Sequence, residues 1–320
     1  MKRLINLISR LLCLAAVVAL AGCNHKELCY HHPHTARVRV VYDWVNAPDA
    51  DPDGMCVWFY PEDGSTPVRV DFSGTDGGYV ELATGRYTAI TFNNDTEAVQ
   101  FGGSGSFDTH YAFTRDGGLL ESIAGAAGKT APQAADERVV ITPDRLWGAS
   151  SAQVDVVDNG GECVITFYPE DLVCHYTCEI RHVTNLGRAD RICGSLSSMS
   201  GALYLGSQQL HTECVTLPFA AEADADGSTI RGEFFTFGHH EANPQRHKVL
   251  IYVWMADGRK LCYGRDVDRF DVTEQIHAAP DRRRVHIIID GLDLPEPIDD
   301  SGGFNVDVDD WTQVNEDLYF

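Results

Sequence analysis

The sequence predicts an all-β fold built from β-sandwiches. Apolar and polar residues alternate with a period of two in many short segments, which is typical of strands with one buried face. Turn-forming clusters such as residues 61–64 and 76–78 separate these segments. No long window shows a helical period, so closely spaced strands should account for most of the chain.

The first expected strand illustrates the pattern. In residues 36–45, Val38 and Val40 share one face, whereas Arg37 and Arg39 share the other. In this half the pattern also predicts strands at residues 55–60, 68–72, 79–82, 87–92 and 138–141. In the second half it predicts them at 153–157, 163–168, 172–183, 202–205, 229–237, 248–255, 284–290 and 304–308. Residues 249–254 are apolar on both faces, which predicts a central strand covered on both sides.

The length predicts two folded domains. A chain of 320 residues is about twice the usual domain length. We expect one sandwich over residues 36–150, a second over 151–297, and an acidic strand or arm over 298–320. The five residues at 59–63 (Phe-Tyr-Pro-Glu-Asp) recur at 167–171, a slight indication that the two halves are alike.

The charge excludes nucleic acid as a main partner. The chain carries 25 Lys and Arg against 47 Asp and Glu, a formal charge of -22. A broad surface for polyanions is incompatible with that balance. The hydrophobic content of 44% is sufficient for a packed core.

The N-terminus has the layout of a lipoprotein signal peptide. Lys2 and Arg3 precede an apolar run at residues 11–20, which is too short to span a bilayer. The run ends in Leu-Ala-Gly-Cys, which resembles the lipobox of bacterial lipoproteins. That resemblance implies cleavage between Gly22 and Cys23, acyl chains on Cys23, a tether over residues 23–35 and attachment to a membrane.

Eight cysteines remain after residues 1–22 and the lipidated Cys23 are set aside. An exported location permits disulfides, but the spacings fix no pairing, and buried free thiols are the alternative for about half of them. Alternation along a strand places Cys174 and Cys178 on one face and His175 on the other, which disfavours a zinc site. We therefore predict no metal and no cofactor.

Motifs that resemble catalytic sites are incomplete. Residues 125–130 imitate the end of a phosphate-binding loop, but Ile123 stands where its first glycine belongs. Pro244 occupies the position of the second histidine that a metalloprotease helix would need after His240. The prediction is a protein that is not an enzyme.

The acidic C-terminal segment contains a candidate arm for strand addition. Phe304, Val306 and Val308 alternate with polar residues, and Trp311 follows them. Such an arm can be donated to a groove, can occupy one, or can complete its own domain. The sequence leaves these alternatives open.

Short motifs along most of the mature chain carry a family resemblance. They are the lipobox, residues 40–44, 54–55, 59–64, 85–87, 93–97 and 143–148, and, in the second half, 176–183 and 196–202. They resemble a Bacteroidetes lipoprotein family of uncharacterised function, similar to the anchor and minor subunits of fimbrillin-type (type V) pili. In the last motif Ser198 stands where the family pattern has glycine.

The resemblance implies two tandem transthyretin-like sandwiches in the outer membrane and docking of a pilin by strand addition. The predicted function is therefore a fimbrial anchor or minor subunit. The alternative is a surface lipoprotein that binds glycans or another ligand through exposed tryptophans among Trp58, Trp147, Trp254 and Trp311. A third reading, a lipid-anchored hydrolase, requires converging carboxylates or a Ser-His pair.

Overall fold

The computed structural model describes residues 34–120, 131–158, 160–240, 243–296 and 311–314. Strands make up nearly all of their regular structure, and the only α-helix among these residues is the short α2 (Thr273–His277). The all-β prediction is confirmed. The signal peptide, Gly22, Cys23 and most of the tether lie outside the described residues, as do Phe304, Val306 and Val308.

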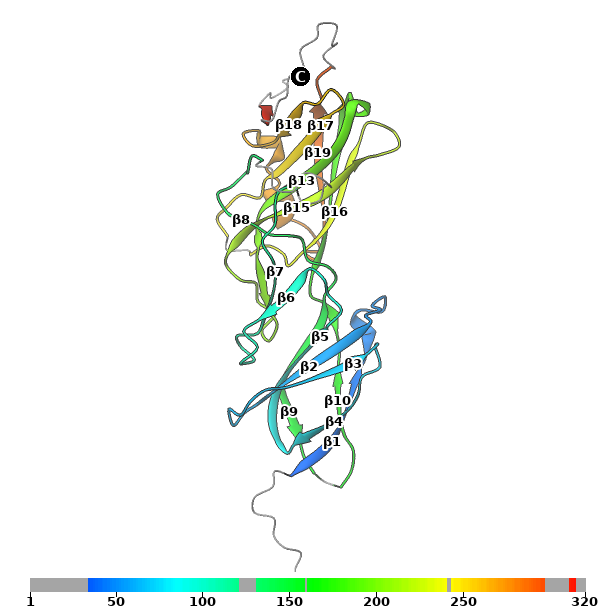
Figure 1. Ribbon diagram of the computed structural model, residues 1–320, viewed down its shortest axis with the longest axis vertical. Helices are drawn as coiled ribbons and strands as arrows, with labels where there is room; N and C mark the ends of the chain where they lie inside the picture. The colour runs from blue at the N-terminus through cyan, green and yellow to red at the C-terminus, as the bar shows by residue number, and fades with distance from the viewer. Residues whose placement is uncertain (1–33, 121–130, 159, 241–242, 297–310, 315–320) are drawn as a thin grey trace, which may run out of the picture. The chain divides into compact units, whose positions relative to one another are not determined.

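Two sheets pack around a first core. One has the order β11 (Glu170–Asp171), β9 (Trp147–Val156), β5 (Gly85–Asn93), β2 (Gly54–Pro61), β3 (Val68–Ser73), and the other has the order β10 (Cys163–Phe167), β1 (Thr35–Tyr42), β4 (Gly78–Ala83) (Figure 1). Val38 and Val40 of β1 face Phe59 and Val154 in a shared cluster. The alternation in the first predicted strand thus separates core from solvent as expected.

A nine-stranded sheet holds the largest core. Its order is β19 (Arg284–Asp293), β12 (Cys174–Thr184), β16 (Ile230–Thr236), β15 (Cys214–Ala223), β13 (Ala189–Ser200), β17 (Val249–Met255), β18 (Lys260–Tyr263), β20 (Thr312–Val314), with β8 (Arg138–Val139) on β15. Every residue of β17 is buried, and β13 and β18 flank it. The prediction of a central strand at residues 249–254 is confirmed.

Strand pairing does not divide the chain at residue 150. Ser150 lies inside β9, and β10 returns to pair with β1. A three-stranded sheet joins β6 (Val99–Gly102) and β7 (Tyr111–Thr114) to β14 (Ala202–Tyr204). The boundary between 36–150 and 151–297 therefore falls within a strand, and the two-domain division stays a prediction.

A bulge in β13 explains the glycine expected at Ser198. The register with β15 shifts between Leu196 and Met199, and Ser198 has a φ of 66°, in the left-handed region that favours glycine. The Ser198 amide donates to a carboxylate oxygen of Glu137 at 2.7 Å. This bond helps to hold a non-glycine residue in that conformation.

Candidate functional site

The C-terminal strand lies on an edge of the nine-stranded sheet, beside the β17–β18 hairpin. Gly258, with a φ of 88°, forms the turn, and the guanidinium of Arg259 pairs with Asp257 at 2.6 Å. The Gly258 amide donates to the Met255 carbonyl at 2.9 Å. The short turn fixes β18 antiparallel to β17 and leaves its other edge for β20.

The side chains of β18 alternate between two buried clusters. Leu261 and Tyr263 join the main core, which is the largest core described above. Cys262 joins a separate cluster on the opposite face of the sheet, called the second cluster below. The Tyr263 hydroxyl donates to the Asp293 carbonyl at 3.2 Å. Burial raises the pKa of the Cys262 thiol to about 12, so this thiol is protonated at neutral pH.

The segment Trp311–Val314 covers the edge of β18. Thr312, Gln313 and Val314 pair in parallel with Leu261, Cys262 and Tyr263. The Trp311 ring meets Trp254 edge-on, with centroids 4.7 Å apart, and Tyr252 with centroids 5.4 Å apart. Val314 packs on the main core from the other face. Of the predicted arm, Trp311 thus contacts the chain's own sheet.

The second cluster lies on the face of the nine-stranded sheet opposite the main core. Leu119, Leu120 and Leu250 are buried in it with Tyr252, whose hydroxyl donates to the Pro132 carbonyl at 2.6 Å. Burial raises the pKa of Tyr252. Parts of the chain before and after residues 121–130 therefore cover this face, and Trp311 completes the cover at its edge.

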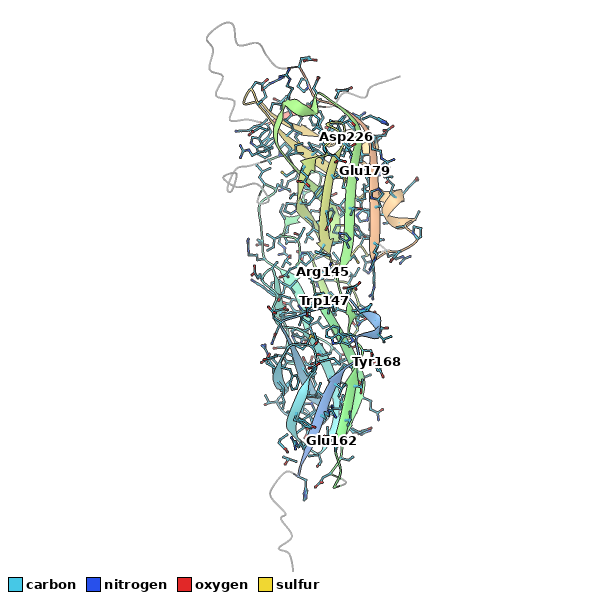
Figure 2. All side chains as sticks on the ribbon, turned by 90° about the vertical axis from the view of Figure 1, so that its right-hand side faces the viewer. Arg145, Trp147, Glu162, Tyr168, Glu179 and Asp226 are labelled. Carbon is cyan, nitrogen blue, oxygen red and sulfur yellow. The ribbon has the colours of Figure 1, made fainter. Side chains whose placement is uncertain are left out.

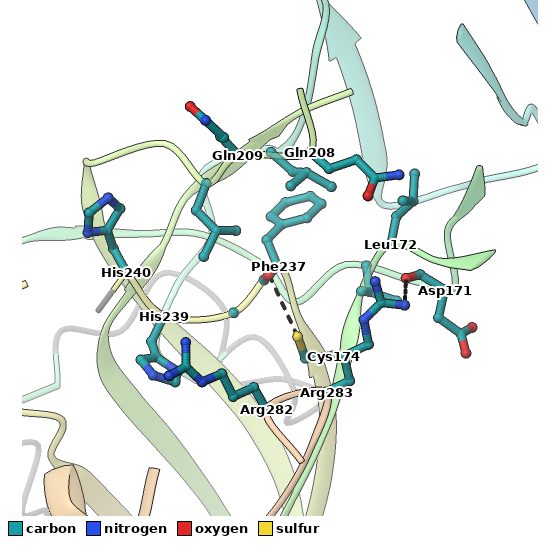
Figure 3. A pocket seen from close by; sticks show the side chains of 14 residues that line it. Asp171, Leu172, Cys174, Gln208, Gln209, Phe237, His239, His240, Arg282 and Arg283 are labelled. Carbon is teal, nitrogen blue, oxygen red and sulfur yellow. Dashed lines mark hydrogen bonds between the residues drawn. The ribbon is translucent and has the colours of Figure 1, made fainter. Parts of the chain in front are cut away.

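A pocket of about 720 Å³ opens near the starts of β12 and β19 (Figure 3). Leu172, Leu203, Leu210 and Phe237 provide apolar lining, and Gln208, Gln209, His240, Arg282 and Arg283 provide polar groups. Arg283 donates to the Asp171 carbonyl at 2.8 Å and pairs with Glu170 at 2.9 Å. Burial raises the pKa of Cys174 to about 11, so this thiol is not a ready nucleophile.

Three histidines meet beside this pocket. The rings of His239 and His277 stack with centroids 4.9 Å apart, and the Nε2 atoms of His247 and His277 are 3.2 Å apart. His247 Nδ1 donates to the Ser197 carbonyl at 3.2 Å, which leaves its Nε2 as an acceptor. Burial lowers the pKa values of His239 and His247 to about 4. Among the residues that the structure describes, no group of three or more potential ligands could hold a metal.

The four tryptophans of the ligand-binding alternative do not form an exposed platform. Trp147 and Trp254 are buried, and Trp58 and Trp311 are half-buried. The guanidinium of Arg145 lies 5.9 Å from the Trp147 ring centroid (Figure 2). The rings of Trp254 and Trp311 stand at 83° to each other. A flat sugar-binding surface requires exposed, coplanar rings, and this set does not supply one.

All seven cysteines in the described ranges are free: Cys56, Cys163, Cys174, Cys178, Cys193, Cys214 and Cys262. Cys29 lies outside those ranges. The buried members of the set fit the free-thiol alternative. The part of the chain that the structure describes thus contains no disulfide.

The sequence did not predict a side-chain contact with the main chain of β19, at the opposite edge of the nine-stranded sheet. The side-chain amide of Gln275 on α2 donates to the Ile288 carbonyl at 2.8 Å and accepts from the Ile288 amide at 2.8 Å. It therefore occupies main-chain groups of β19 as a neighbouring strand would. A lone glutamine on a five-residue helix gives no signal of this role in the sequence.

These features define an all-β protein with mixed sheets and a C-terminal strand added to a sheet edge. The described residues include no helix long and apolar enough to cross a membrane. Within this class, the chain belongs to the family described as "Domain of unknown function (DUF5119)", whose model matches residues 22–220.

One curated relative and two solved structures extend the comparison. The relative is "Putative fimbrium anchoring subunit Fim4B" of Bacteroides ovatus, 22% identical over 227 residues, which are 71% of this chain and 64% of the relative. The match thus spans less than two thirds of that relative's length.

The first structure is described as a "putative adhesin" from Bacteroides ovatus, with a TM-score of 0.62 and 18% identity over 86% of this chain and 99% of that one. The second, from Bacteroides thetaiotaomicron, is described among "putative polysaccharide binding proteins", with a TM-score of 0.51 and 12% identity over 80% of this chain and 90% of that one. Both share the fold of this chain.

Proposed function

We propose that this protein is a non-enzymatic outer-membrane lipoprotein that acts as a fimbrial anchor or minor subunit. The observation that carries the proposal is the pairing of Thr312–Val314 with β18, because a sheet edge that takes a strand from a distant part of the chain is suited to strand addition. The name of the Bacteroides ovatus relative supports the same role.

The membrane attachment in this proposal is the lipid on Cys23. Removal of residues 1–22 takes away three basic groups and no acids, so the mature charge is 22 minus 47, or -25. Anionic head groups repel such a body, which favours a protein that projects from the membrane on its tether. The partner is a pilin or another fimbrial subunit, held through main-chain hydrogen bonds.

The test is a pull-down of epitope-tagged protein from cross-linked native cells, with the bound proteins identified. We expect a β-sandwich pilin to be recovered from the membrane fraction. The matched variant Cys23→Ser should leave the fold intact but release the protein and its bound pilin from that fraction.

Recovery of a surface-exposed protein with no fimbrial subunit would contradict the anchor proposal. That outcome would favour the ligand-binding alternative, which would then need a site other than the four tryptophans. The pocket beside Phe237 would be the place to examine with glycan arrays.

A further inference from the structure

We propose that the pocket beside Phe237 is a binding site for an acidic sugar, which is a sugar ring that carries a carboxylate. The inference goes beyond the anchor function and does not depend on it. It is carried by three kinds of group that line the same pocket: an apolar floor, guanidinium groups and side-chain amides.

The size and the floor of the pocket suit a ring with an apolar face. Its volume of about 720 Å³ lies in the range of small-molecule sites, which is about 300–1,000 Å³. Leu172, Leu203 and Phe237 on the floor are each 8% exposed or less and belong to one packed cluster. The floor is therefore preformed, and the C–H groups on one face of a sugar ring can pack against it.

Two guanidinium groups attract an anion to the pocket. Arg283 is held by Glu170 at 2.9 Å and by the Asp171 carbonyl at 2.8 Å, so Glu170 balances its charge. Arg282 adds a second positive charge, which reaches the pocket because it contributes to the low pKa of His239, another lining residue. Figure 3 shows the Asp171 carboxylate pointing away from the apolar floor. A guanidinium binds a carboxylate through charge-assisted hydrogen bonds.

The amides lie in a strained turn. Gln208 has a φ of 55°, in the left-handed region where a residue other than glycine stores strain. The turn is closed by the Tyr204 amide, which donates to the Gln209 carbonyl at 2.9 Å. In Figure 3 the Gln208 amide lies on the same side of the Phe237 ring as the Arg283 guanidinium. Side-chain amides donate and accept, as sugar hydroxyls do, whereas the tail of a fatty acid would offer them no polar group.

Isothermal titration calorimetry of the purified full chain with digalacturonate tests the proposal. The control ligand is the dimethyl ester of the same disaccharide, which keeps the sugar rings but has no charge. We expect the acid to bind about tenfold more tightly than the ester, as the loss of a charge-assisted hydrogen bond predicts.

Two arginine variants form a matched pair. Arg282→Gln should weaken binding of digalacturonate about tenfold, because it removes a charge from the lining. Arg284→Gln makes the same change in the same run of arginines but outside the lining, and it should leave the affinity unchanged. Equal affinities of Arg282→Gln and wild type would overturn the inference.

Gln208→Gly separates binding from stability. Glycine adopts a positive φ without strain, so this variant should keep or raise the melting temperature. It should nevertheless weaken binding about threefold, because the amide is lost. Unchanged affinity in this folded variant would overturn the assignment of a sugar.

The wild-type protein gives the remaining outcomes. Equal binding of the acid and the ester, or no binding of either, would overturn the inference. Decanoate is the probe for an apolar acid, and binding of decanoate as tight as that of digalacturonate would overturn the assignment of a sugar.

Discussion

The nine-stranded sheet ends in two different strands, β19 at one edge and β20 at the other. At one end β19 pairs in parallel with β12, from His175 with Arg284 to Thr184 with Asp293. At the other end β20 pairs in parallel with β18, and within the described residues the pairing runs from Leu261 with Thr312 to Tyr263 with Val314. The orientation is the same, and the described residues of the two strands differ in burial.

Burial distinguishes the two end strands. Val285, Ile287 and Ile289 of β19 are each 2% exposed or less, whereas no described residue of the β20 segment is fully buried. Gln275 also occupies the main chain of β19 at Ile288. The β19 end is therefore held by core side chains and by an additional side-chain contact to its main chain.

The largest effect should come from removing core volume at β19. Ile287→Ala should lower the free energy of unfolding by about 2–5 kcal/mol, because Ile287 is fully buried and leaves a cavity. Urea denaturation followed by circular dichroism measures it. A loss no larger than that of the β20 variant below would contradict the comparison.

Acid should loosen the β19 end next. α2 packs against β19 and ends at His277, which contacts His239 and His247. The lowered pKa values of His239 and His247, about 4 against 6.5 normally, mean that the unfolded chain binds more protons between these values. Stability from these groups is therefore complete above about pH 6.5 and declines as the pH falls towards 4.

Charged and titratable groups beside the rings of His239 and His247 also shift the pKa values of these two histidines. Asp271 raises the pKa of His247, whereas His277 lowers it, and Arg282 lowers that of His239. Thermal unfolding from pH 8 to pH 4 should show the decline, and His247→Asn should reduce its slope. An unchanged slope in that variant would exclude His247 as a source. The segment Trp311–Val314 carries no group that titrates in this range.

A smaller effect is expected at β20. Trp311→Ala should lower the free energy of unfolding by about 1–2 kcal/mol, since the half-buried ring leaves Tyr252 and Trp254. Hydrogen exchange at β18 should increase while exchange at β19 stays the same. Faster exchange at both ends would mean that β20 is part of the cooperative core.

The smallest effect should follow from Gln275→Ala. Loss of two exposed side-chain bonds to Ile288 should cost about 1 kcal/mol or less, but it opens the β19 edge. Light scattering at high protein concentration should then show more association than Glu274→Ala, an exposed neighbour on the same helix. Equal association of the two variants would remove the capping role from Gln275.

The hydrophobic pattern of the sequence was sufficient for β1, which has one solvent-exposed face, and for the fully buried β17, but it failed for two other central strands. It located β1, β2 and β17, but not β13 or β15, where Gly194 and Pro218 resemble turn residues. Gly194 is in the strand because the Phe219 ring lies over it, and a Cβ there would be 2.2 Å from the ring. A cross-strand packing requirement of this kind is invisible in one strand's pattern.

The site was predictable in part for a related reason. The alternation of Phe304, Val306 and Val308 indicated a possible arm that runs to Trp311. Of these four residues the structure describes Trp311, whose ring lies against Trp254. The strand that receives it, β18, has four residues and no alternation that separates it from a turn. Pairing between distant segments depends on the whole fold, so local patterns indicate a strand but not its neighbour.

The return of β10 to β1 also constrains how a nascent chain can fold. Val38 pairs with Cys163, which is 163 minus 38, or 125, residues further along the chain. During vectorial synthesis the N-terminal strand emerges first and must wait for this late partner. Non-local pairing of this kind slows folding and leaves an edge open to wrong neighbours in the meantime. A cellular holding factor would therefore be most useful before residue 163 has emerged.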